Sequence, residues 1–372
     1  MRLLIAGGGT GGHLFPGVAI AEELKARDPD AVVRFVGTAR GIEARVLPDL
    51  GWDLTMIEVS GLKTVGLWGA VKGMLRLPRA LWQARRVLKE FKPDAVIGVG
   101  GYASGPVVLM ARLGRRPAAI CEQNSIPGFT NKLLGRVVKQ VFLSFAMSQR
   151  FFKAKKVVMS GNPVRRELAA KLLDVASTAG ARAADAPVSV LISGGSLGAV
   201  AVNDLASQAL IALARTRPIR IVHQTGVADE AKIAARYREA GVEADVRAFI
   251  KDMAAAYQQA DLIVCRAGAT TVAELAIAGK PAIFIPYPHA ADNHQELNAR
   301  EMAEAGAAMM FKQRELTADK LAMAIGPLLA DPETRVAMGA KMRELAHPRA
   351  AATIVDWCEA QTTTRPVALD KA

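Results

Sequence analysis

The sequence predicts an α/β protein with two Rossmann-like domains, whose parallel sheets face each other across a cleft. Its 372 residues, 51% of them hydrophobic, are too many for one ordinary core and too apolar for a disordered chain. Short runs rich in Val and Ile alternate with helical patterns, which is typical of βαβ units. Two such series follow each other, and each opens with a strand, a glycine-rich turn and a helix.

The first domain is predicted over residues 1–162. Its first strand, at 3–6, leads into a run of glycines and then into an amphipathic helix at 18–25. Short apolar runs indicate the later strands. These are expected at 32–36, 54–59, 95–99, 118–121, 137–143 and 157–160.

The second domain is predicted over residues 188–345. Its strands are expected at 188–193, 219–224, 246–250, 262–265 and 282–285. Residues 163–187 are rich in Ala and charged residues and begin and end with proline, so we expect a linker between the domains there. The chain ends with a segment at 346–372, which includes a predicted helix at 350–359.

Composition excludes several classes of protein. No apolar run approaches the roughly 20 residues of a membrane-spanning helix, and the first strand leads into glycines rather than a signal peptide, so we expect a cytoplasmic protein. Cys121, Cys265 and Cys358 have no Cys-x-x-Cys spacing, which predicts buried thiols rather than disulfides or zinc. No pattern requires a metal, and the one Asp-x-Asp, at 28–30, is expected to be a surface turn.

The net charge of +13 is concentrated in the first domain. Residues 1–162 hold 24 Lys and Arg against 11 Asp and Glu, whereas the rest of the chain holds 24 of each. The segment 59–89 has no acid, and its basic residues alternate with Leu, Val, Met and Trp, which is typical of an amphipathic helix on anionic lipid. A solvated basic helix packed on the sheet is the alternative. The basic residues are Lys63, Lys72, Arg76, Arg79, Arg85, Arg86 and Lys89.

A second acid-free stretch, at 123–166, adds nine Lys and Arg to the same domain. Nucleic acid is the other partner that such charge suggests. Interleaved stacking motifs and recognisable nucleic-acid-binding folds are missing from the sequence, so we expect no nucleic-acid partner.

The first glycine turn, residues 7–13, reads Gly-Gly-Gly-Thr-Gly-Gly-His. Glycines allow a sharp turn and a close approach to a ligand, and a helix N-terminus favours negative charge. Gly7, Gly9 and Gly12 also satisfy the dinucleotide fingerprint, so an NAD(P)-dependent oxidoreductase is an alternative. The second strand carries no acidic residue for an adenine ribose, which argues against NAD, although Arg40 would suit an NADP phosphate.

His13 occupies the start of the predicted helix. The positive end of a helix favours the neutral imidazole, which is then available as a base at neutral pH. The alternative is a histidine that only caps the helix. Because it follows a run of Gly and Thr at the carboxyl edge of a sheet, we favour a catalytic role.

The second glycine turn, residues 193–199, opens the second domain in the same way. Its backbone N–H groups and the Ser196 hydroxyl are suited to hold a diphosphate. A further strand-to-helix turn, at 265–274, places Arg266 and Thr270 for phosphate oxygens and Glu274 for a ribose diol. The polar loop 286–295 is rich in groups that bond sugar hydroxyls.

Taken together, these motifs resemble those of the GT-B glycosyltransferases, over nearly the whole chain. Within them they are similar to the enzymes that add N-acetylglucosamine to the undecaprenyl-linked muramyl-peptide precursor of the bacterial cell wall. Any one motif is weak alone, but their order along the chain is specific. The motifs lie at 7–13, 98–104, 122–124 with Asn131, 161–165, 194–199, 266–274 and 294–295.

The resemblance implies roles for individual residues. Uracil would lie against the backbone near Phe249 and Ile250, and the ribose at Glu274. The diphosphate would lie at Ser196 with Arg165 nearby, and the sugar hydroxyls at Gln295. The other donor-binding residues implied are Thr10, Gly11, Gly12, Asn124, Arg266 and Thr270. The acceptor would contact Gly100, Gly101, Tyr102 and Asn131, together with Glu122. One departure is Cys121, where the family commonly has a histidine.

The resemblance also implies the reaction. An inverting, metal-independent transfer without a cofactor is expected from UDP-N-acetylglucosamine to the 4-hydroxyl of undecaprenyl-diphospho-N-acetylmuramoyl-pentapeptide. His13 is the expected base, and Glu122 is the alternative base or orients the acceptor. A UDP-sugar epimerase of the same fold is a further alternative. The implied location is the cytoplasmic face of the bacterial inner membrane, in peptidoglycan synthesis, cell shape and cell division, with cell-wall synthesis proteins as candidate partners. The C-terminal helix is expected to cross back to the first domain.

Overall fold

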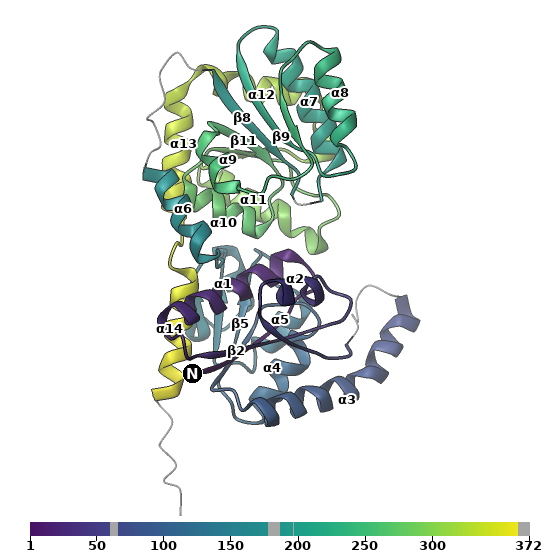
Figure 1. Cartoon of the computed structure of the whole chain (residues 1–372), viewed down its shortest axis with the longest axis vertical. Coiled ribbons are helices and arrows are strands. Elements are labelled where there is room, and N and C mark those ends of the chain that lie inside the picture. Colours follow the sequence, from purple (N-terminus) through teal and green to yellow (C-terminus); the bar gives the residue numbers. More distant parts are fainter. Residues whose placement is uncertain (60–65, 178–186, 196, 364–372) are drawn as a thin grey trace, which may run out of the picture. The chain divides into compact units, whose positions relative to one another are not determined.

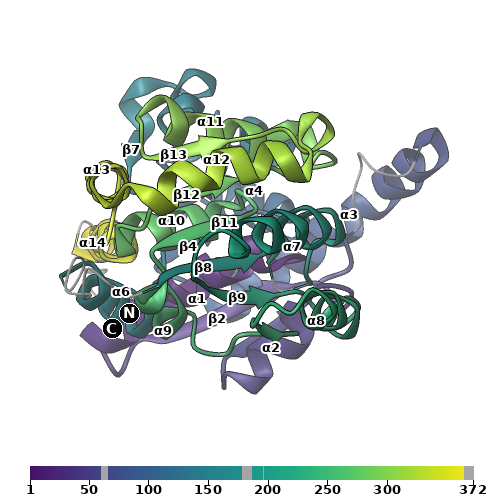
Figure 2. The ribbon, with the colours of Figure 1, turned by 90° about the horizontal axis from the view of Figure 1, so that it is seen from above.

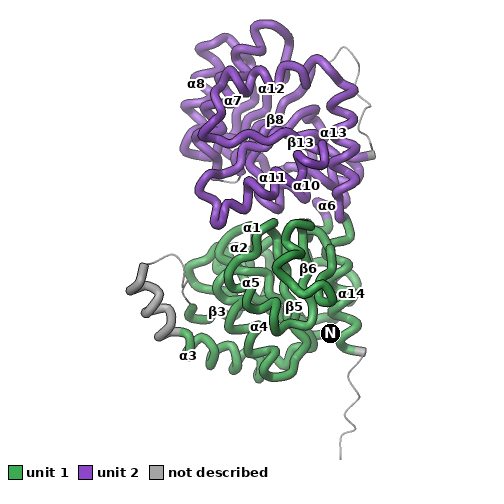
Figure 3. Tube along the Cα trace, turned by 180° about the vertical axis from the view of Figure 1, so that it is seen from behind, with its two compact units in different colours: residues 1–166, 348–372 green, residues 167–347 purple. Residues whose placement is uncertain are grey.

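The computed structural model describes residues 1–59, 66–177, 187–195 and 197–363, with only the backbone given for 66–76, 177 and 363. The chain forms two compact units, which Figure 3 shows in different colours. Unit 1 consists of Met1–Arg166 and Pro348–Ala372, and unit 2 of Glu167–His347.

Unit 1 is built on a parallel sheet of seven strands, in the order β3-β2-β1-β4-β5-β6-β7. The central strands β1, β4 and β5 are almost wholly buried, because helices cover both faces of a parallel sheet. The strands are β1 Arg2–Ala6, β2 Val32–Gly37, β3 Asp53–Met56, β4 Ala95–Gly98, β5 Ala118–Glu122, β6 Gln140–Leu143 and β7 Val157–Met159.

Two cores lie on the two faces of this sheet. One is formed with α1 (Gly11–Arg27) and α14 (Ala350–Thr363), and the other with α3 (Gly66–Phe91) and α4 (Ser104–Leu113). Figure 1 shows α14 beside α1, and Arg27 fixes the pair by ion pairs to Asp356 at 2.6 Å and Glu359 at 3.1 Å. The C-terminal helix therefore packs within unit 1. Short helices complete the unit: α2 Glu43–Asp49, α5 Phe129–Leu134 and the 3₁₀ turns Ala146–Phe151 and Ala154–Lys156.

Unit 2 contains a parallel sheet of six strands, in the order β10-β9-β8-β11-β12-β13. Figure 2 shows α7 and α12 side by side over this sheet, where their apolar side chains form one core with β8 and β11. The strands are β8 Val188–Ser193, β9 Ile219–Gln224, β10 Asp245–Arg247, β11 Leu262–Cys265, β12 Ala282–Phe284 and β13 Ala308–Met310. The helices are α6 Arg166–Ser177, α7 Val200–Ala214, α8 Glu230–Glu239, α9 Met253–Gln259, α10 Ala269–Ala278, α11 His294–Glu304, α12 Ala318–Ala330 and α13 Pro332–Glu344, with 3₁₀ turns at Ala291–Asn293 and Gln313–Glu315.

The structure differs from the sequence expectations in several places. Strands β3 and β10 end at Met56 and Arg247, three residues before the expected ends at 59 and 250. Helix α6 occupies much of the expected linker at 163–187, and it buries Ala169, Leu172 and Val175 along one side. Strand β6 begins at 140 rather than 137, because the N–H groups of 137 and 138 bond to the carbonyl of Leu134 in the turn after α5. Strand β13 is only three residues long and has no counterpart in the prediction.

Candidate functional site

Two glycine turns pack against each other in unit 1, at the carboxyl ends of the adjacent strands β1 and β4. A Cβ on Gly101 would lie 2.3 Å from the carbonyl oxygen of Gly8, and one on Gly7 would lie 2.4 Å from that of Gly100. Gly8, Gly100 and Gly101 have positive φ angles that side chains rarely adopt. Glycine is therefore required here both for backbone conformation and for the close approach of the two turns.

His13 stands at the junction of these turns, in the first turn of α1. Its Nδ1 lies 3.3 Å from the Thr10 hydroxyl, and its ring is packed against Gly100, where a Cβ would lie 2.6 Å from Cδ2. The side chain is half-buried, as is Gly11, while Thr10 and Gly12 are exposed. The predicted residues Thr10–His13 and Gly100–Gly101 thus come together, with Tyr102 exposed beside them.

Glu43, which the sequence analysis did not single out, lies beneath the first turn. Only 1% of it is exposed, and its carboxylate accepts hydrogen bonds from the N–H of Gly9 at 2.7 Å and the N–H of Thr38 at 2.9 Å. The Thr38 hydroxyl donates to it as well, at 3.0 Å. Side chains at Gly8 or Gly41 would collide with this carboxylate. Glu43 therefore holds the shape of the turn.

Glu122 ends strand β5, and its carboxyl group is enclosed by donors. It accepts from the side chain of Asn131 at 2.8 Å and from the backbone N–H groups of Asn124 at 3.0 Å and Gly128 at 3.3 Å. The Asn131 amide also donates to the Cys121 carbonyl at 3.1 Å. The predicted residues Glu122, Asn124 and Asn131 therefore form one hydrogen-bonded cluster.

Burial raises the pKa of Glu122 from 4.5 to about 7, against the opposing effect of its hydrogen bonds. Between these two pH values the folded protein keeps a proton that the unfolded chain has released. The stability of unit 1 should therefore fall as pH rises through this window, by about 3 kcal/mol in total.

The variant Glu122→Gln should remove that pH dependence, because glutamine does not titrate. All four tryptophans of the chain belong to unit 1, so urea unfolding followed by tryptophan fluorescence reports on this unit. We expect the wild type to lose about 3 kcal/mol more than the variant between about pH 4.5 and pH 7.5. Parallel pH profiles for the two proteins would contradict the raised pKa.

Cys121 precedes Glu122 in strand β5. Its side chain is buried in the core that unit 1 forms with α1 and α14, close to Cys358. Burial raises the pKa of the Cys121 thiol far above its usual range, and the charge of Glu122 adds to the effect. Cys121 therefore contributes to packing.

The second glycine turn follows β8 in unit 2 and leads into α7. It is closed by a hydrogen bond from the Gly198 N–H to the Gly195 carbonyl at 2.9 Å. A Cβ on Gly198 would lie 2.0 Å from the Thr225 carbonyl oxygen, so this turn too depends on a close backbone approach. Ser196, the residue predicted to hold the diphosphate, lies outside the described residues.

Gln224 ties this turn to the predicted uracil site. Its amide donates to the Gly195 carbonyl at 3.0 Å, and its Oε1 accepts from the N–H of Ile250 at 2.9 Å. Ile250 is 4% exposed. The Ile250 N–H is therefore engaged within the chain.

Glu274, the predicted ribose ligand, is half-buried on α10. Its Oε2 accepts a hydrogen bond from the hydroxyl of Tyr257 at 3.0 Å. Thr270 lies one turn earlier on the same helix, and its hydroxyl oxygen is buried with no hydrogen-bond partner in the described part of the chain. Tyr257 was not identified from sequence.

The guanidinium of Arg266 is directed at the loop after β12. It donates to the carbonyls of Ile285 at 2.9 Å and Pro286 at 3.0 Å, and to Gln313 Oε1 at 2.7 Å. Burial lowers the pKa of Arg266 to about 10. A buried guanidinium needs acceptors, and the backbone and Gln313 supply them here. The expected contact of Arg266 with phosphate oxygens stays a prediction.

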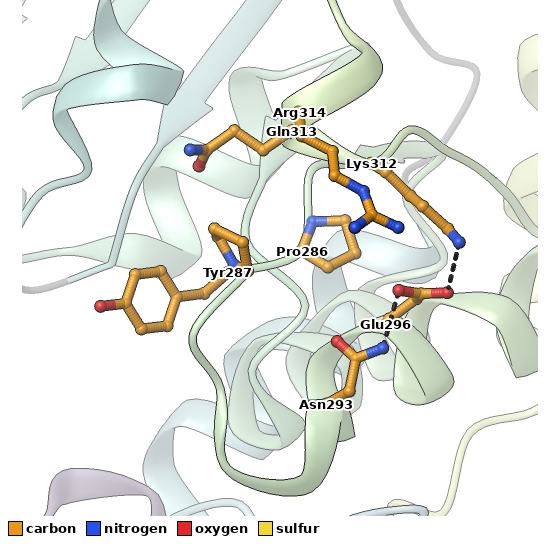
Figure 4. A pocket seen from close by; sticks show the side chains of 8 residues that line it. Pro286, Tyr287, Asn293, Glu296, Lys312, Gln313 and Arg314 are labelled. Atoms are coloured by element: carbon orange, nitrogen blue, oxygen red, sulfur yellow. Dashed lines mark hydrogen bonds and ion pairs between the residues drawn. The ribbon is translucent and has the colours of Figure 1, made fainter.

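The loop 286–295 lines a pocket of about 210 Å³ (Figure 4). Glu296 on its wall accepts from Asn293 at 2.7 Å and pairs with Lys312 at 3.0 Å, and these interactions, Asn293 foremost, lower the pKa of Glu296. Gln295 Oε1 accepts from the Tyr287 N–H at 3.0 Å. The pocket is lined by Pro286, Tyr287, Pro288, Asn293, Glu296, Lys312, Gln313 and Arg314.

Arg165, Thr10, Gly11, Gly12 and Asn124 belong to unit 1, whereas the remaining predicted donor residues belong to unit 2. Arg165 is half-buried just before α6. Within the described ranges, His, Cys, Asp and Glu side chains form no group of three or more suited to a metal ion.

The predicted lipid-facing segment corresponds to α3. From residue 77 onward it buries Ala80, Ala84 and Leu88 and exposes Trp82, which is 62% accessible. Two of its exposed arginines pair with acids just outside the acid-free segment: Arg79 with Glu58 at 2.8 Å, and Arg86 with Glu90 at 2.7 Å. Lys63 and the side chains of Lys72 and Arg76 lie outside the described residues. No helix in the described ranges has both the length and the apolarity needed to cross a bilayer.

Comparison with known proteins identifies the family. Residues 3–143 match the N-terminal domain of glycosyltransferase family 28, and residues 189–354 match its C-terminal domain. A protein of Anaeromyxobacter sp. (strain K) is 50% identical over 96% of this chain and 92% of its own length. It is named UDP-N-acetylglucosamine--N-acetylmuramyl-(pentapeptide) pyrophosphoryl-undecaprenol N-acetylglucosamine transferase.

Solved structures agree with this assignment. The crystal structure of Acinetobacter baumannii MurG matches with a TM-score of 0.81 and 35% identity, over 96% of this chain and 99% of that one. The UDP-GlcNAc 2-epimerase of Neisseria meningitidis matches with a TM-score of 0.69 but only 14% identity, over 98% of this chain and 100% of that one, so it shares the fold alone. The fold class predicted from sequence is confirmed, and the chain belongs to glycosyltransferase family 28.

Proposed function

We propose that this family 28 protein transfers N-acetylglucosamine from UDP-N-acetylglucosamine to the 4-hydroxyl of undecaprenyl-diphospho-N-acetylmuramoyl-pentapeptide. The observation that carries this proposal is 50% identity, over 96% of the chain, to a protein named for that transfer. The chemistry of both sites supports it. Unit 2 offers a half-buried carboxylate and a glycine turn suited to a nucleotide diphosphate, and unit 1 offers an imidazole and an enclosed carboxyl group.

The reaction is an inverting displacement. The acceptor 4-oxygen attacks the anomeric carbon and forms the new glycosidic bond, the bond from that carbon to the phosphate oxygen breaks, and UDP leaves with the bonding electron pair. A base takes the proton of the acceptor hydroxyl. Backbone N–H groups at the second glycine turn and at the start of α10 stabilise the charge that develops on the departing diphosphate.

The residues assigned to the donor belong mainly to unit 2, and a smaller number belong to unit 1. Glu274 accepts from the ribose hydroxyls, Ser196 and Thr270 face the diphosphate, and Gln295 binds the sugar. Because the Ile250 N–H is bonded to Gln224, its carbonyl oxygen is the group that accepts from uracil N3. Arg266 positions the loop that carries the sugar-binding residues. Thr10, Gly11, Gly12, Asn124 and Arg165 complete the donor-binding set.

The acceptor is assigned to unit 1, with His13 as the base. The imidazole is half-buried and set against Gly100, next to Gly101 and Tyr102, which contact the acceptor sugar. Glu122 is almost wholly buried, and its hydrogen bonds shape the loop between β5 and α5. Its role is to orient the acceptor.

Release of UDP in the presence of EDTA tests this function. With UDP-N-acetylglucosamine and a lipid-linked or short-chain muramyl acceptor, we expect UDP release that depends strictly on the acceptor and persists without divalent metal. Release or epimerisation without acceptor would instead support a sugar-nucleotide epimerase. Reduction of NAD or NADP would support an oxidoreductase.

Unit 1 is also proposed to rest on the cytoplasmic face of the bacterial inner membrane, because the acceptor's tail lies in the bilayer. Helix α3 exposes Trp82 and Arg85, and the neighbouring α4 ends with the exposed Leu113. Exposed apolar side chains among basic ones bind anionic lipid surfaces. Peptidoglycan synthesis, and through it cell shape and division, is the proposed process, and cell-wall synthesis proteins are the proposed further partners.

Arg85→Glu should weaken binding to vesicles that contain anionic lipid by about 30-fold, because a basic residue near the surface contributes about 1 kcal/mol and the reversal changes two charges. Vesicle sedimentation measures the effect. Arg238→Glu, an equal change of charge on the exposed side of α8 in unit 2, should bind as the wild type does. Equal losses in both variants would show that only net charge matters.

A further inference from the structure

A buried tyrosine is hydrogen-bonded to the carboxylate assigned to the ribose. The Tyr257 hydroxyl donates to Oε2 of Glu274 at 3.0 Å, and the tyrosine itself is only 2% exposed. Tyr257 lies on α9 and Glu274 on the adjoining α10, so the bond joins two helices that both follow strands of the unit 2 sheet. The tyrosine thus reaches the carboxylate from the interior of the unit.

Helix α9 is fixed at both ends, and this fixes the tyrosine. Asp252 caps its N-terminus by accepting from the Ala255 N–H at 3.0 Å. At the other end, the buried ammonium of Lys280 donates to the Ala260 carbonyl at 2.8 Å. The hydroxyl is also held in its donor form, because burial, together with the charge of Glu274, raises the pKa of Tyr257 well above its usual range.

We propose that Tyr257 is a positioning residue that orients the Glu274 carboxylate toward the two ribose hydroxyls of the donor and so sets the preference for ribose over 2′-deoxyribose. This rests on the proposed function, in which Glu274 binds the ribose. A carboxylate has about four acceptor positions, so it accepts from the tyrosine and from a diol together. The bond from Tyr257 restricts the rotamers of the Glu274 side chain before the donor binds, so less rotamer freedom is lost on binding.

The test compares the binding of UDP and 2′-deoxy-UDP by calorimetry, which needs no turnover. The wild type should prefer UDP. Tyr257→Phe should weaken UDP binding by about tenfold, as expected when the glutamate side chain must be ordered as the donor binds, and 2′-deoxy-UDP binding by less. The preference for ribose should therefore shrink at least threefold.

Tyr237→Phe is the matched control. Tyr237 is equally buried in unit 2, and its hydroxyl bonds to His223 at 3.1 Å rather than to Glu274. This variant also lacks one buried hydroxyl, but it should keep the wild-type preference for ribose. If both variants change the preference equally, the effect is general destabilisation and the proposal is wrong.

A double-mutant cycle with Glu274→Ala gives a second readout, which holds even if one variant is less stable. In the Glu274→Ala background the ribose preference should already be lost, and Tyr257→Phe should change it no further. An unchanged preference in Tyr257→Phe alone, or a further loss on top of Glu274→Ala, would overturn the positioning role. Failure of the wild type to bind either nucleotide would instead overturn the proposed function.

Discussion

His13→Ala is expected to lower kcat by about 10²–10⁴-fold with little change in the KM for UDP-N-acetylglucosamine. The factor is typical for loss of a positioned general base. His13 is bonded to Thr10 and packed on Gly100, so its imidazole is set at the edge of the paired turns. Donor binding is assigned mainly to unit 2, which is why the donor KM should change little. Steady-state turnover with a soluble muramyl acceptor measures both constants.

Two control variants distinguish the role of His13 as base from that of other histidines and of Glu122. His347→Ala, which removes an exposed histidine of unit 2, should keep wild-type turnover. Glu122→Gln should reduce turnover less than His13→Ala, because Glu122 is enclosed by donors of its own loop. Near-normal turnover in His13→Ala, together with loss of turnover in Glu122→Gln, would reverse the two roles.

Gly101→Ala is expected to abolish most of the activity and to destabilise unit 1. The new Cβ would lie 2.3 Å from the Gly8 carbonyl oxygen, so the two glycine turns would have to separate and His13 would lose its support. The alanine must also keep the backbone φ of +79° that Gly101 has, which costs about 1–2 kcal/mol for a residue with a side chain. Urea unfolding followed by tryptophan fluorescence, with turnover on the same samples, measures both effects.

Gly9→Ala isolates the steric part of the Gly101 effect. Gly9 also has a positive φ, of +90°, but a Cβ there would have no atom within 4 Å. Gly9→Ala should therefore be destabilised only by its positive φ angle, and it should unfold at a higher urea concentration than Gly101→Ala. Equal destabilisation by the two substitutions would show that the turns do not depend on their close contact.

Much of the fold was predictable because buried parallel strands are continuous apolar runs. Strands β8, β9 and β11 begin and end where the Val and Ile runs do. The short edge strand β13 was missed, because its three residues, Ala-Met-Met, are too few to show a periodic pattern. Helix α6 was missed for a different reason. Its composition is that of a linker, and only the spacing of Ala169, Leu172 and Val175 indicates a buried face.

The candidate site was predictable where its residues are neighbours in sequence, and not where the fold brings them together. The glycine turns are local patterns, so they were found together with His13. Glu43 lies 34 positions from Gly9, and Tyr257 lies 17 positions from Glu274. Neither belongs to a motif, and only the arrangement of strands and helices brings them to their partners. For Arg266, sequence indicated the position but not the direction of its guanidinium.

Transfer of labelled N-acetylglucosamine to the lipid fraction is the most direct test of the proposed reaction. The purified chain would be incubated with radiolabelled UDP-N-acetylglucosamine and the undecaprenyl-linked muramyl-pentapeptide, and the label in the lipid compared with the UDP released. We predict one labelled sugar in the lipid for each UDP, through a β-linkage to the 4-hydroxyl. His13→Ala should transfer at most about 1% as much label in the same time. UDP released without label in the lipid, or label recovered as an epimerised sugar, would contradict the proposed reaction.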